Sequence, residues 1–355
     1  MVTEDEAMRR AIALAGRGLG TTSPNPVVGC LLLDADGDVV GEGFHAYAGG
    51  PHAEIVALAQ AGELARGGTA VVTLEPCNHT GRTGPCAQAL ITAGVKRVVI
   101  AVDDPTPIAA GGAATLRAAG VQVETGVRRA DAEHGNIAWL TAVRRRWPYV
   151  TWKFAATLDG RSAAADHTSQ WITSAPARSD VHLLRSTVDA IIAGVGTVIA
   201  DDPQLTVRDL RDGSLAIRQP LRVVVDTNGR TPEKARVRDV AATTWIATAA
   251  EVGVGADGRV DLSALLAQLF GRGIRGVLLE GGPTLAGAFL GAGLVDRVIG
   301  YIAPKLLGDG LPALVGAGVT TITDAIELDL TDIAQIGPDL RFTACCAYPR
   351  RKTPE

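Results

Sequence analysis

The feature that most constrains the fold is an alternation between helical and strand-like segments, which runs along the chain twice. Short apolar runs separate stretches with helical spacing, a pattern typical of layered α/β domains with a largely buried sheet. In the first half, the predicted strands are 27–33, 70–74, 97–102 and 121–125, and the predicted helices are 4–18, 51–65, 85–93 and one ending at 116–119. In the second half, the predicted strands are 149–156, 190–193, 222–226, 244–247, 276–280 and 295–302, and the predicted helices are 175–187 and 283–290.

A polar, proline-interrupted segment separates the two alternations. It reads Arg144, Arg145, Arg146, Trp147 and Pro148, which is typical of a domain boundary. A chain of 355 residues is also too long for one ordinary core, so two domains are expected. We therefore predict a first α/β domain over residues 1–146 and a second over 147–350, with the three arginines as a solvated linker.

Charge and composition exclude several classes of protein. Residues 1–146 hold 13 Lys and Arg against 15 Asp and Glu, and the remainder holds 21 against 23, so neither half has the basic excess that nucleic-acid binding needs. No apolar stretch is long enough to cross a membrane, and the acidic N-terminus lacks the apolar core of a signal peptide. Five sparse cysteines do not make a disulfide framework, so we expect a cytoplasmic protein.

The most informative residues of the first half are His52, Glu54, Cys77 and Cys86. One imidazole and two thiolates suit Zn²⁺, which prefers nitrogen and sulfur ligands in a tetrahedral site. Three protein ligands leave a fourth position for water, whose pKa the ion lowers toward about 7. Glu54 is too close to His52 in the chain to bind the same ion easily, but it can reach that water and transfer its proton. This spacing is typical of zinc deaminases that act on amino-substituted nitrogen rings.

Other interpretations of these residues stay open. The thiols can be ordinary buried cysteines beside a surface His52, or the zinc can be structural, with His79 as a fourth ligand. We favour His79 as a pocket residue in contact with the substrate, and His45 either lines that pocket or lies in a solvated loop. The other three cysteines are expected to be structural: Cys30, Cys345 and Cys346.

Two further stretches carry a family resemblance. Residues 75–86 read EPCNHTGRTGPC and residues 22–29 read TSPNPVVG. Both resemble the bifunctional deaminase/reductases of riboflavin biosynthesis, whose motif reads roughly EPC-S-H-x-GRTPPC. The resemblance implies that Asn25 helps to bind the pyrimidine. Asn78 replaces a usual Ser, Gly84 a usual Pro and Thr106 a frequent Asn, which leaves the three zinc ligands intact but alters fine substrate contacts.

The second half carries glycine-rich corners of a kind that can hold phosphate. Gly194-Val195-Gly196-Thr197 and Gly281-Gly282 each stand between a predicted strand and a predicted helix, where backbone amides can bind a pyrophosphate. Neither is a G-x-G-x-x-G fingerprint, so each alone could be a plain turn. Together with KFAATLDGR at 153–161, SQWIT at 169–173 and DDPQLTVR at 201–208, they resemble the reductase half of the same family.

This resemblance covers residues 4 to 347 and implies a fold, a cofactor and a set of contacts. The first domain is expected to be a cytidine-deaminase-like three-layer αβα unit, and the second a dihydrofolate-reductase-like α/β unit. The implied NADPH contacts are Ala155, Trp171, Thr197, Asp201, Thr227, Gly282, Pro283, Thr284, Leu285, Ala286, Gly287 and Ala288. The implied substrate contacts are Ser169, Arg185, Leu205, Arg208 and Glu280.

Some of these residues also have a chemical rationale of their own. Arg185 and Arg208 can fork onto a ribose phosphate; the alternative for each is an ordinary charge on a surface helix or loop. Lys153 either positions the sugar or cofactor or pairs with an acid. Trp171 either covers a cofactor ring or caps the core, and Asp201 either contacts the cofactor or makes a loop hydrogen bond.

The resemblance implies two successive reactions. Zinc-dependent hydrolysis removes an amine from 2,5-diamino-6-ribosylamino-4(3H)-pyrimidinone 5′-phosphate, and NADPH then reduces the ribosyl group to a ribityl chain. The cofactors are Zn²⁺ and NADPH, the partner is a small molecule, and a homo-oligomer, dimer or tetramer, is expected. The alternatives are a deaminase of nucleic-acid bases and a non-catalytic protein that binds zinc and a nucleotide.

Overall fold

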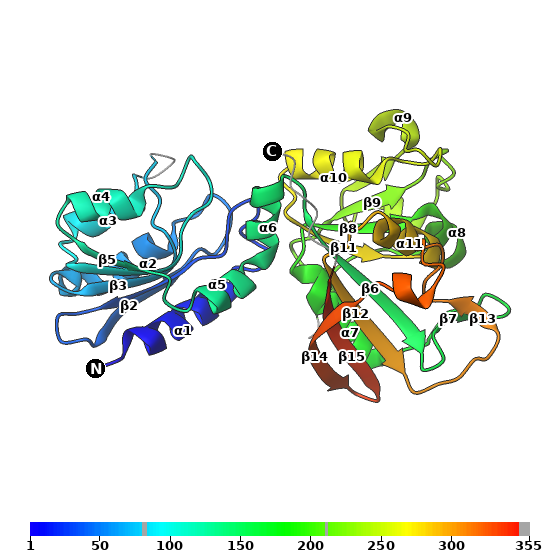
Figure 1. Cartoon of the computed structure of the whole chain (residues 1–355), viewed down its shortest axis with the longest axis horizontal. Helices are drawn as coiled ribbons and strands as arrows, with labels where there is room; N and C mark the ends of the chain where they lie inside the picture. The colour runs from blue at the N-terminus through cyan, green and yellow to red at the C-terminus, as the bar shows by residue number, and fades with distance from the viewer. Residues whose placement is uncertain (80–83, 210–211, 348–355) are drawn as a thin grey trace. The chain divides into compact units, whose positions relative to one another are not determined.

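The computed structural model describes residues 1–79, 84–209 and 212–347. The chain forms two compact units, Met1–Arg144 and Arg145–Glu355, each with its own sheet (Figure 1). The boundary predicted after residue 146 lies two residues beyond this division. Part of the predicted motif loop, residues 80–83, and the predicted end of the second domain, residues 348–350, lie outside the described residues.

The first unit is built on a five-stranded sheet in the order β2-β1-β3-β4-β5. Strand β1 is antiparallel to β2 and β3, whereas β3, β4 and β5 are parallel. Its strands are β1 Gly29–Leu33, β2 Val39–Phe44, β3 Thr69–Leu74, β4 Arg97–Val102 and β5 Gln122–Thr125. Its helices are α1 Glu4–Gly16, α2 Ala53–Ala61, η1 Gly62–Ala65, α3 Cys86–Thr92, α4 Gly112–Ala118, α5 Arg129–Gly135 and α6 Ile137–Arg145.

Helices cover both faces of this sheet. One core joins the sheet to α1, α5 and α6 through residues such as Met8 and Leu140, and the other joins it to α2, α3 and α4 through residues such as Leu90 and Leu116. Helix α1 begins at a capping box, in which the Thr3 side chain accepts from the Glu6 amide and Glu6 accepts from the Thr3 amide. The predicted three-layer αβα architecture is confirmed.

The second unit contains an eight-stranded sheet in the order β10-β9-β8-β11-β6-β12-β15-β14. The strands from β10 to β12 in this order are parallel to one another. Strand β15 is antiparallel to β12, and β14 is antiparallel to β15. Its strands are β6 Tyr149–Thr157, β7 Arg161–Ala164, β8 Ala190–Gly194, β9 Leu221–Val225, β10 Thr244–Ala247, β11 Gly276–Glu280, β12 Arg297–Ala303, β13 Gly310–Pro312, β14 Leu328–Ile336 and β15 Asp339–Cys346. Its helices are α7 Ala175–Ser186, α8 Val195–Asp201, η2 Arg236–Arg238, α9 Ala249–Val252, α10 Leu262–Gly271, α11 Pro283–Gly291 and η3 Ile322–Asp324.

Alternate residues of the central strands enter different cores, as a sheet covered on both faces requires. On β8, Ala190 and Ile192 pack with α10 and α11, whereas Ile191 and Ala193 pack with residues of α8 and of the segment around Val237. Helix α7 packs through Ala177 and Val181 against β12. The second α/β domain is therefore as predicted, although strands β7, β13 and β14, most of β15, and helices α8, α9 and α10 were not anticipated.

Two details of the sequence interpretation are corrected. Arg144 and Arg145 belong to helix α6, and Arg145 forms a bidentate ion pair with Asp296. This segment is therefore not a solvated linker. Pro51 precedes helix α2, whose N-cap is His52.

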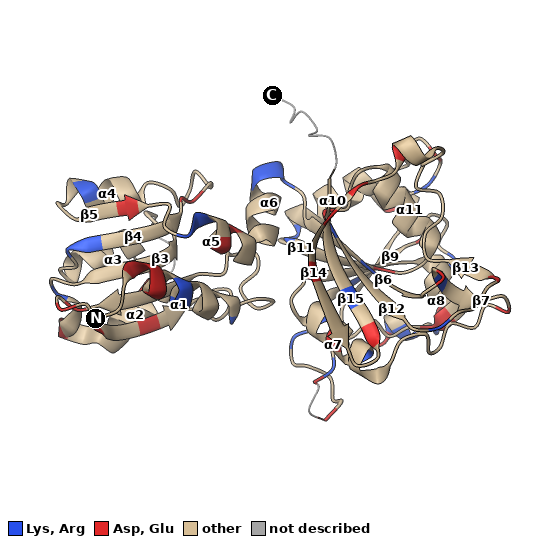
Figure 2. Cartoon of the chain, turned by 60° about the horizontal axis from the view of Figure 1, so that its bottom comes forward, with Lys and Arg blue, Asp and Glu red and all other residues tan. Residues whose placement is uncertain are grey.

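Charges of both signs are interspersed over each unit (Figure 2). No helix among the described residues is long and apolar enough to cross a membrane.

Candidate active sites

The first site is a cluster of three metal-ligand side chains at the ends of two helices and a strand. His52 is the N-cap of α2, Cys77 follows β3, and Cys86 is the first residue of α3. Their ligand atoms all lie within 4.8 Å of one another, with Nδ1 of His52 3.5 Å from Sγ of Cys77 and 3.3 Å from Sγ of Cys86. One nitrogen and two sulfur donors at this spacing fit a zinc ion with one open coordination position.

The electrostatics of the cluster favour soft-metal binding. Hydrogen bonds from Cys86 and from His52 lower the pKa of Cys77 to about 4, so a thiolate is present at neutral pH. The pKa of the Cys86 thiol is raised, because it donates to Cys77 and is buried. The amide of Cys86 also donates to Sγ of Cys77 at 3.4 Å. A thiolate held by such donors is ready to ligate a cation.

Glu54 lies in the first turn of α2, directly beside the cluster. It is 3% exposed, and burial raises the pKa of its carboxyl to about 7. The helix that carries it packs closely on β2, since a Cβ at Gly43 would lie 2.2 Å from the carbonyl oxygen of Ala53. A buried carboxyl that titrates near neutrality and interacts with Cys86 suits a group that accepts and returns protons.

Asn25 and His45 form a hydrogen-bonded pair next to these residues. Nδ1 of His45 lies 3.0 Å from the Pro51 carbonyl oxygen, and Nε2 lies 3.3 Å from Nδ2 of Asn25. Burial lowers the pKa of His45, so the ring is neutral, donates from Nδ1 and accepts the Asn25 amide at Nε2. The ring centroids of His45 and His52 are 5.5 Å apart. His45 is therefore a buried residue of the site and not a solvated loop histidine.

His79 is not among the ligand atoms that cluster within the described residues. Its Nδ1 is buried without a hydrogen-bond partner in the part of the chain that the structure describes, and its substrate contact stays a prediction. Among the departures from the family motif, Asn78 accepts from the Thr115 hydroxyl at 3.0 Å, and the Thr106 hydroxyl donates to Asp104 at 2.6 Å. Both side chains are thus engaged with their own domain.

Sequence reasoning did not anticipate the role of Glu75. Its buried carboxylate accepts from the amides of Asp104, Gly111 and Ala113 at 2.9–3.1 Å. Glu75 thereby ties the end of β3, two residues before Cys77, to the start of α4. The only sequence signal was its place in the EPC triplet.

The second site is a cleft of about 1340 Å³ at the carboxyl ends of β6, β11, β8 and β9. Most of the predicted reductase residues line it: Lys153, Ala155, Ser169, Trp171, Arg185, Thr197, Asp201, Leu205, Arg208, Thr227, Glu280, Gly282, Pro283, Thr284, Leu285 and Ala288. Ala286 and Gly287 do not line it. Ala286 is fully buried, and a Cβ at Gly287 would lie 1.8 Å from the Val315 carbonyl oxygen.

The two glycine corners meet in this cleft, as a dinucleotide pyrophosphate requires. The amide of Gly282 donates to Oγ1 of Thr197 at 2.7 Å. Gly281 has φ of +141°, and a Cβ there would lie 3.2 Å from Oγ1 of Thr197, so this corner favours glycine. The volume of the cleft and the two helix N-termini that open into it fit an extended dinucleotide such as NADPH.

Three charged side chains form a buried ion cluster beside the glycine corners. Nε and Nη2 of Arg185 donate to the carboxylate of Glu280 at 2.6 and 3.0 Å, and Nζ of Lys153 lies 3.8 Å from Glu280. Burial alone would raise the pKa of Glu280, but Arg185 and Lys153 outweigh it and lower that pKa to about 2. Burial lowers the pKa of Lys153. Arg185 also donates to the Thr206 carbonyl, so each of its three guanidinium nitrogens has a partner within the protein, and its contact with a substrate phosphate stays a prediction.

Other residues that were predicted to contact the ligands interact with neighbouring residues of the cleft wall. Trp171 is 62% exposed and does not cap the core; the guanidinium carbon of Arg178 lies 4.3 Å from its ring centroid. The Ser169 hydroxyl donates to Asp201 at 3.0 Å. A residue predicted to bind the substrate, Ser169, thus contacts a residue predicted to bind the cofactor, Asp201. Arg208 donates to Gln204 and to the Gly213 carbonyl. Sequence reasoning missed several lining residues that stand in no motif: His182, Arg230, Arg236, Arg259 and Tyr301.

Comparison with known proteins places both halves in one family. Residues 148–342 match the family described as RibD C-terminal domain, and residues 1–102 match the cytidine and deoxycytidylate deaminase zinc-binding region. The chain is 49% identical to riboflavin biosynthesis protein RibD of Mycobacterium tuberculosis, over 95% of each chain, and 45% identical to that of Escherichia coli, over 94% of this chain and 96% of that protein.

Solved structures agree along the whole chain. Acinetobacter baumannii RibD is 43% identical, with a TM-score of 0.87 over 97% of this chain and 99% of that one. A diaminohydroxyphosphoribosylaminopyrimidine deaminase/5-amino-6-(5-phosphoribosylamino)uracil reductase from Thermotoga maritima is 34% identical, with a TM-score of 0.88 over the same shares of the two chains. The similarity therefore covers both units and not one of them alone.

Proposed function

The chain belongs to the RibD family of bifunctional riboflavin biosynthesis enzymes, and we propose how its own residues carry the two reactions. It is a zinc-dependent deaminase and an NADPH-dependent reductase. We propose 2,5-diamino-6-ribosylamino-4(3H)-pyrimidinone 5′-phosphate as the substrate of the first reaction, in keeping with the name of the Thermotoga maritima enzyme. The observation that carries this proposal is the buried Glu54 beside a cluster of one nitrogen and two sulfur ligands.

In the deaminase unit, His52, Cys77 and Cys86 would hold the zinc ion. When bound, the ion lowers the pKa of a water molecule and so makes a nucleophile available at neutral pH. Glu54 would accept one proton of that water and deliver it to a ring nitrogen as the C–O bond forms. It would then transfer the proton of the new hydroxyl group to the departing amine, so that the C–N bond breaks and ammonia leaves. Asn25, oriented by His45, binds the pyrimidine edge.

In the reductase unit, the two glycine corners, next to Lys153 and Glu280, would hold NADPH. The cofactor supplies a hydride to C1′ of the ribosyl group. The bond between C1′ and the ring oxygen breaks, and that oxygen takes up a proton. Nζ of Lys153 is the acid that we assign to this step, because burial lowers its pKa and Glu280 and Arg185 fix its position.

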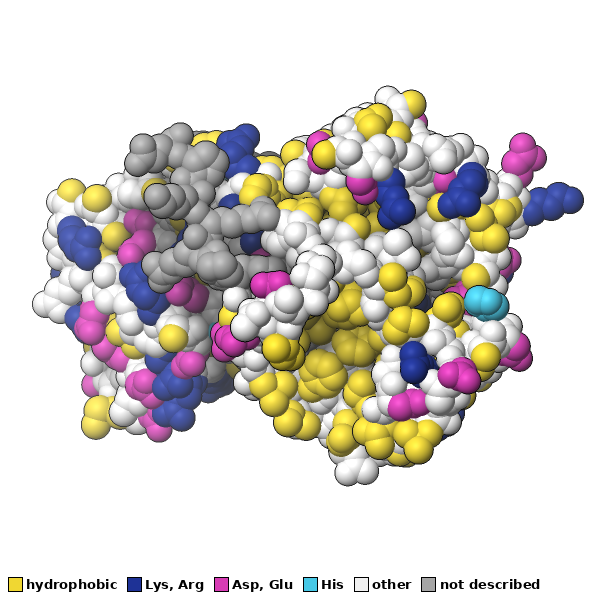
Figure 3. Space-filling model, turned by 45° about the vertical axis from the view of Figure 1, so that its right-hand side comes forward, with side chains coloured by type: hydrophobic (Ala, Val, Ile, Leu, Met, Phe, Trp, Pro, Cys, Tyr) yellow, Lys and Arg dark blue, Asp and Glu magenta, His cyan; other side chains and the backbone are white. Residues whose placement is uncertain are grey.

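We also propose that the protein is a cytoplasmic homo-oligomer that assembles through its second unit. Strand β14 is an edge strand, and its exposed side chains include Leu328, Leu330 and Ile333, which are 42%, 56% and 62% exposed. Hydrophobic side chains gather on the face of this unit that is turned forward in Figure 3. A long apolar edge favours pairing with another copy. The five cysteines, all within the described residues, form no disulfide, which fits a reducing compartment.

The test is a paired assay on the purified chain. The diaminopyrimidine ribosyl phosphate is supplied and ammonia release is followed; NADPH is then added and its absorbance is followed. We expect both signals from the wild type. Zinc-loaded protein that releases no ammonia would overturn the deaminase proposal, and ammonia release without NADPH oxidation would overturn the reductase proposal.

A further inference from the structure

The segment that follows α8, residues 202–208, forms part of the cleft wall and has an unusual backbone. Leu205 has a φ of +52° and Asp202 a φ of +40°, in the left-handed region that residues with a Cβ rarely adopt. Contacts with other elements must therefore hold this segment in place. Gln204, which lines the cleft and for which the sequence suggested no role of its own, lies at the centre of these contacts.

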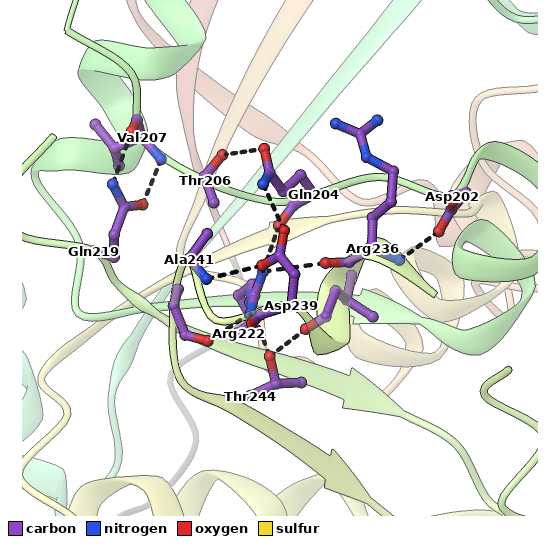
Figure 4. Close-up of polar contacts among 12 residues, drawn as sticks. Asp202, Gln204, Thr206, Val207, Gln219, Arg222, Arg236, Asp239, Ala241 and Thr244 are labelled. Atoms are coloured by element: carbon purple, nitrogen blue, oxygen red, sulfur yellow. Dashed lines mark hydrogen bonds and ion pairs between the residues drawn. The ribbon is translucent and has the colours of Figure 1, made fainter. Parts of the chain in front are cut away.

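A fully buried arginine ties the segment to the sheet. Arg222, on β9, donates from Nη1 to the carbonyl oxygen of Gln204 at 3.1 Å and to Oδ1 of Asp239 at 2.8 Å (Figure 4). Its Nε donates to the Thr244 hydroxyl at 2.8 Å, and its Nη2 donates to the Asp239 carbonyl oxygen at 2.6 Å. All three guanidinium nitrogens are therefore engaged, as a buried arginine requires. Arg222 thereby fixes both Asp239 and the backbone of Gln204.

The carboxylate of Asp239 orients the side chain of Gln204. Nε2 of Gln204 donates to Oδ2 of Asp239 at 2.6 Å. An ionised carboxylate only accepts hydrogen bonds, so the amide nitrogen faces Asp239 and the amide oxygen faces the other way. That oxygen, Oε1, accepts from Nη2 of Arg208 at 2.8 Å and from the Thr206 hydroxyl at 3.3 Å. Figure 4 shows the Gln204 amide between Asp239 and Thr206.

These contacts leave the charge of Arg208 available to a ligand. Its guanidinium lines the cleft, and its hydrogen-bond acceptors within the described residues, Oε1 of Gln204 and the Gly213 carbonyl oxygen, are uncharged. The amide of Arg208 donates to Nδ1 of His182 at 3.2 Å, which fixes the backbone but not the side chain. A guanidinium held only by neutral acceptors in a cleft can bind an anionic group.

We propose that Gln204 is a positioning residue, which holds the guanidinium of Arg208 in the orientation that binds the phosphate of the ribosyl substrate. The inference rests on the proposed reductase function and deepens it. Arg222 and Asp239 fix Gln204, and Gln204 fixes Nη2 of Arg208 before the substrate arrives. Without the Gln204 amide, the substrate itself must order this long side chain, and the cost of that ordering weakens binding.

The test measures reduction of 5-amino-6-(5-phosphoribosylamino)uracil, the compound in the name of the Thermotoga maritima enzyme, and of the same compound without its phosphate. Gln204→Met keeps the length of the side chain but removes both amide groups. We expect KM for the phosphorylated compound to rise by about two- to tenfold, the cost of ordering one long side chain, with kcat changed by less than about twofold. KM for NADPH and kcat/KM for the compound without phosphate should each change by less than about twofold, because neither depends on the contact between Arg208 and the phosphate.

A double-mutant cycle shows whether Gln204 acts through Arg208. Arg208→Ala should lower kcat/KM for the phosphorylated compound by at least about tenfold, since it removes a charged hydrogen-bond donor. Adding Gln204→Met to Arg208→Ala should cause less than about a twofold further loss, because the group that Gln204 positions is already absent. Losses that simply multiply would mean that Gln204 acts in another way, and would overturn the proposal.

Gln268→Met is the matched control. Gln268 is a half-buried glutamine of α10, outside the cleft lining, whose amide donates to backbone carbonyl oxygens of Glu251 and Val252. It should leave KM for both compounds unchanged. An unchanged KM in Gln204→Met, or an equal rise for the compounds with and without phosphate, would overturn the positioning role alone. A wild type that reduces neither compound would instead overturn the proposed reductase on which this role rests.

Discussion

Two buried glutamates, one in each unit, show how neighbours decide what a carboxyl group can do. Glu54 is 3% exposed and Glu280 is 7% exposed. Burial raises the pKa of Glu54 to about 7, because its surroundings do not offset the loss of solvation. Burial also favours a higher pKa for Glu280, but Arg185 and Lys153 outweigh it and lower that pKa to about 2. Burial alone therefore does not assign a chemical role to a carboxyl group.

The difference fits the division of labour that we propose. A carboxyl whose pKa lies near 7 can exchange protons during a hydrolytic reaction at neutral pH. A carboxylate whose pKa lies near 2 stays charged and acts as a fixed point for its two cationic partners. In this proposal Glu54 is the catalytic residue, whereas Glu280 forms ion pairs with Lys153 and Arg185 in the cleft.

The largest effect is expected for Glu54→Gln, which keeps the shape of the side chain but removes the proton acceptor. Ammonia release should fall by about 10³-fold or more, since general acid–base groups contribute factors of about 10² to 10⁴. Reduction of substrate that is already deaminated should change by less than about twofold. Glu63→Gln is the control, because Glu63 is an exposed glutamate of the same unit. A variant that still releases ammonia at the wild-type rate would contradict the role of Glu54.

Glu280→Gln should act on stability as well as on reduction. It leaves Arg185 and Lys153 buried without their counter-ion, and loss of one partner of a buried ion pair costs about 3–5 kcal/mol. Urea unfolding of the second unit should therefore shift to lower urea, and kcat/KM for the reductase should fall, while ammonia release persists. Glu251→Gln, at an exposed glutamate that bonds to Trp245, should change stability by less than about 0.5 kcal/mol. Equal effects from both variants would remove the distinction between the two glutamates.

The two sites also differ in how far the sequence could predict them. His52, Glu54, Cys77 and Cys86 lie within a short stretch whose spacing indicates both the metal and the proton carrier. Glu280 and Arg185 are 95 residues apart, and their contact depends on the packing of α7 against a strand that is distant in sequence. No local sequence pattern could show that N–H groups of Arg185 already donate hydrogen bonds to the carboxylate of Glu280.

Local sequence patterns also failed to predict a strand that contains glycines and a helix that is uniformly apolar. Strand β2 reads VVGEGF, and its glycines, which let α2 pack closely, weaken the strand signal. Helix α10 reads LSALLAQLFG and is too uniformly apolar to show a clear helical face. Gly287 stands in a segment expected to touch the cofactor, yet it allows close packing against Val315. In these cases tertiary packing, and not local propensity, explains the residue.

A smaller effect is expected from the aromatic wall of the cleft. Arg178→Ala removes the guanidinium that lies over Trp171, and such a contact contributes about 0.5–1 kcal/mol at an exposed site. KM for NADPH should therefore rise by about two- to fivefold with little change in kcat. Arg272→Ala is the matched control, because Arg272 lies over Trp245 outside the cleft lining. A rise in KM in both variants would point to a general loss of stability.

An effect of similar size is a pH dependence that belongs to Glu280. Its pKa is lowered by folding, so the stability that it contributes is present above the unfolded pKa of about 4.3 and is lost as the pH falls toward 2. The difference in free energy of unfolding between the wild type and Glu280→Gln should be constant from pH 8 to 5.5. It should shrink by about 1 kcal/mol between pH 5 and 3.5, as measured by urea unfolding of the second unit. A difference that instead shrank between pH 7 and 5 would mean that Glu280 titrates near neutrality, as Glu54 does, and that its two cations do not control it.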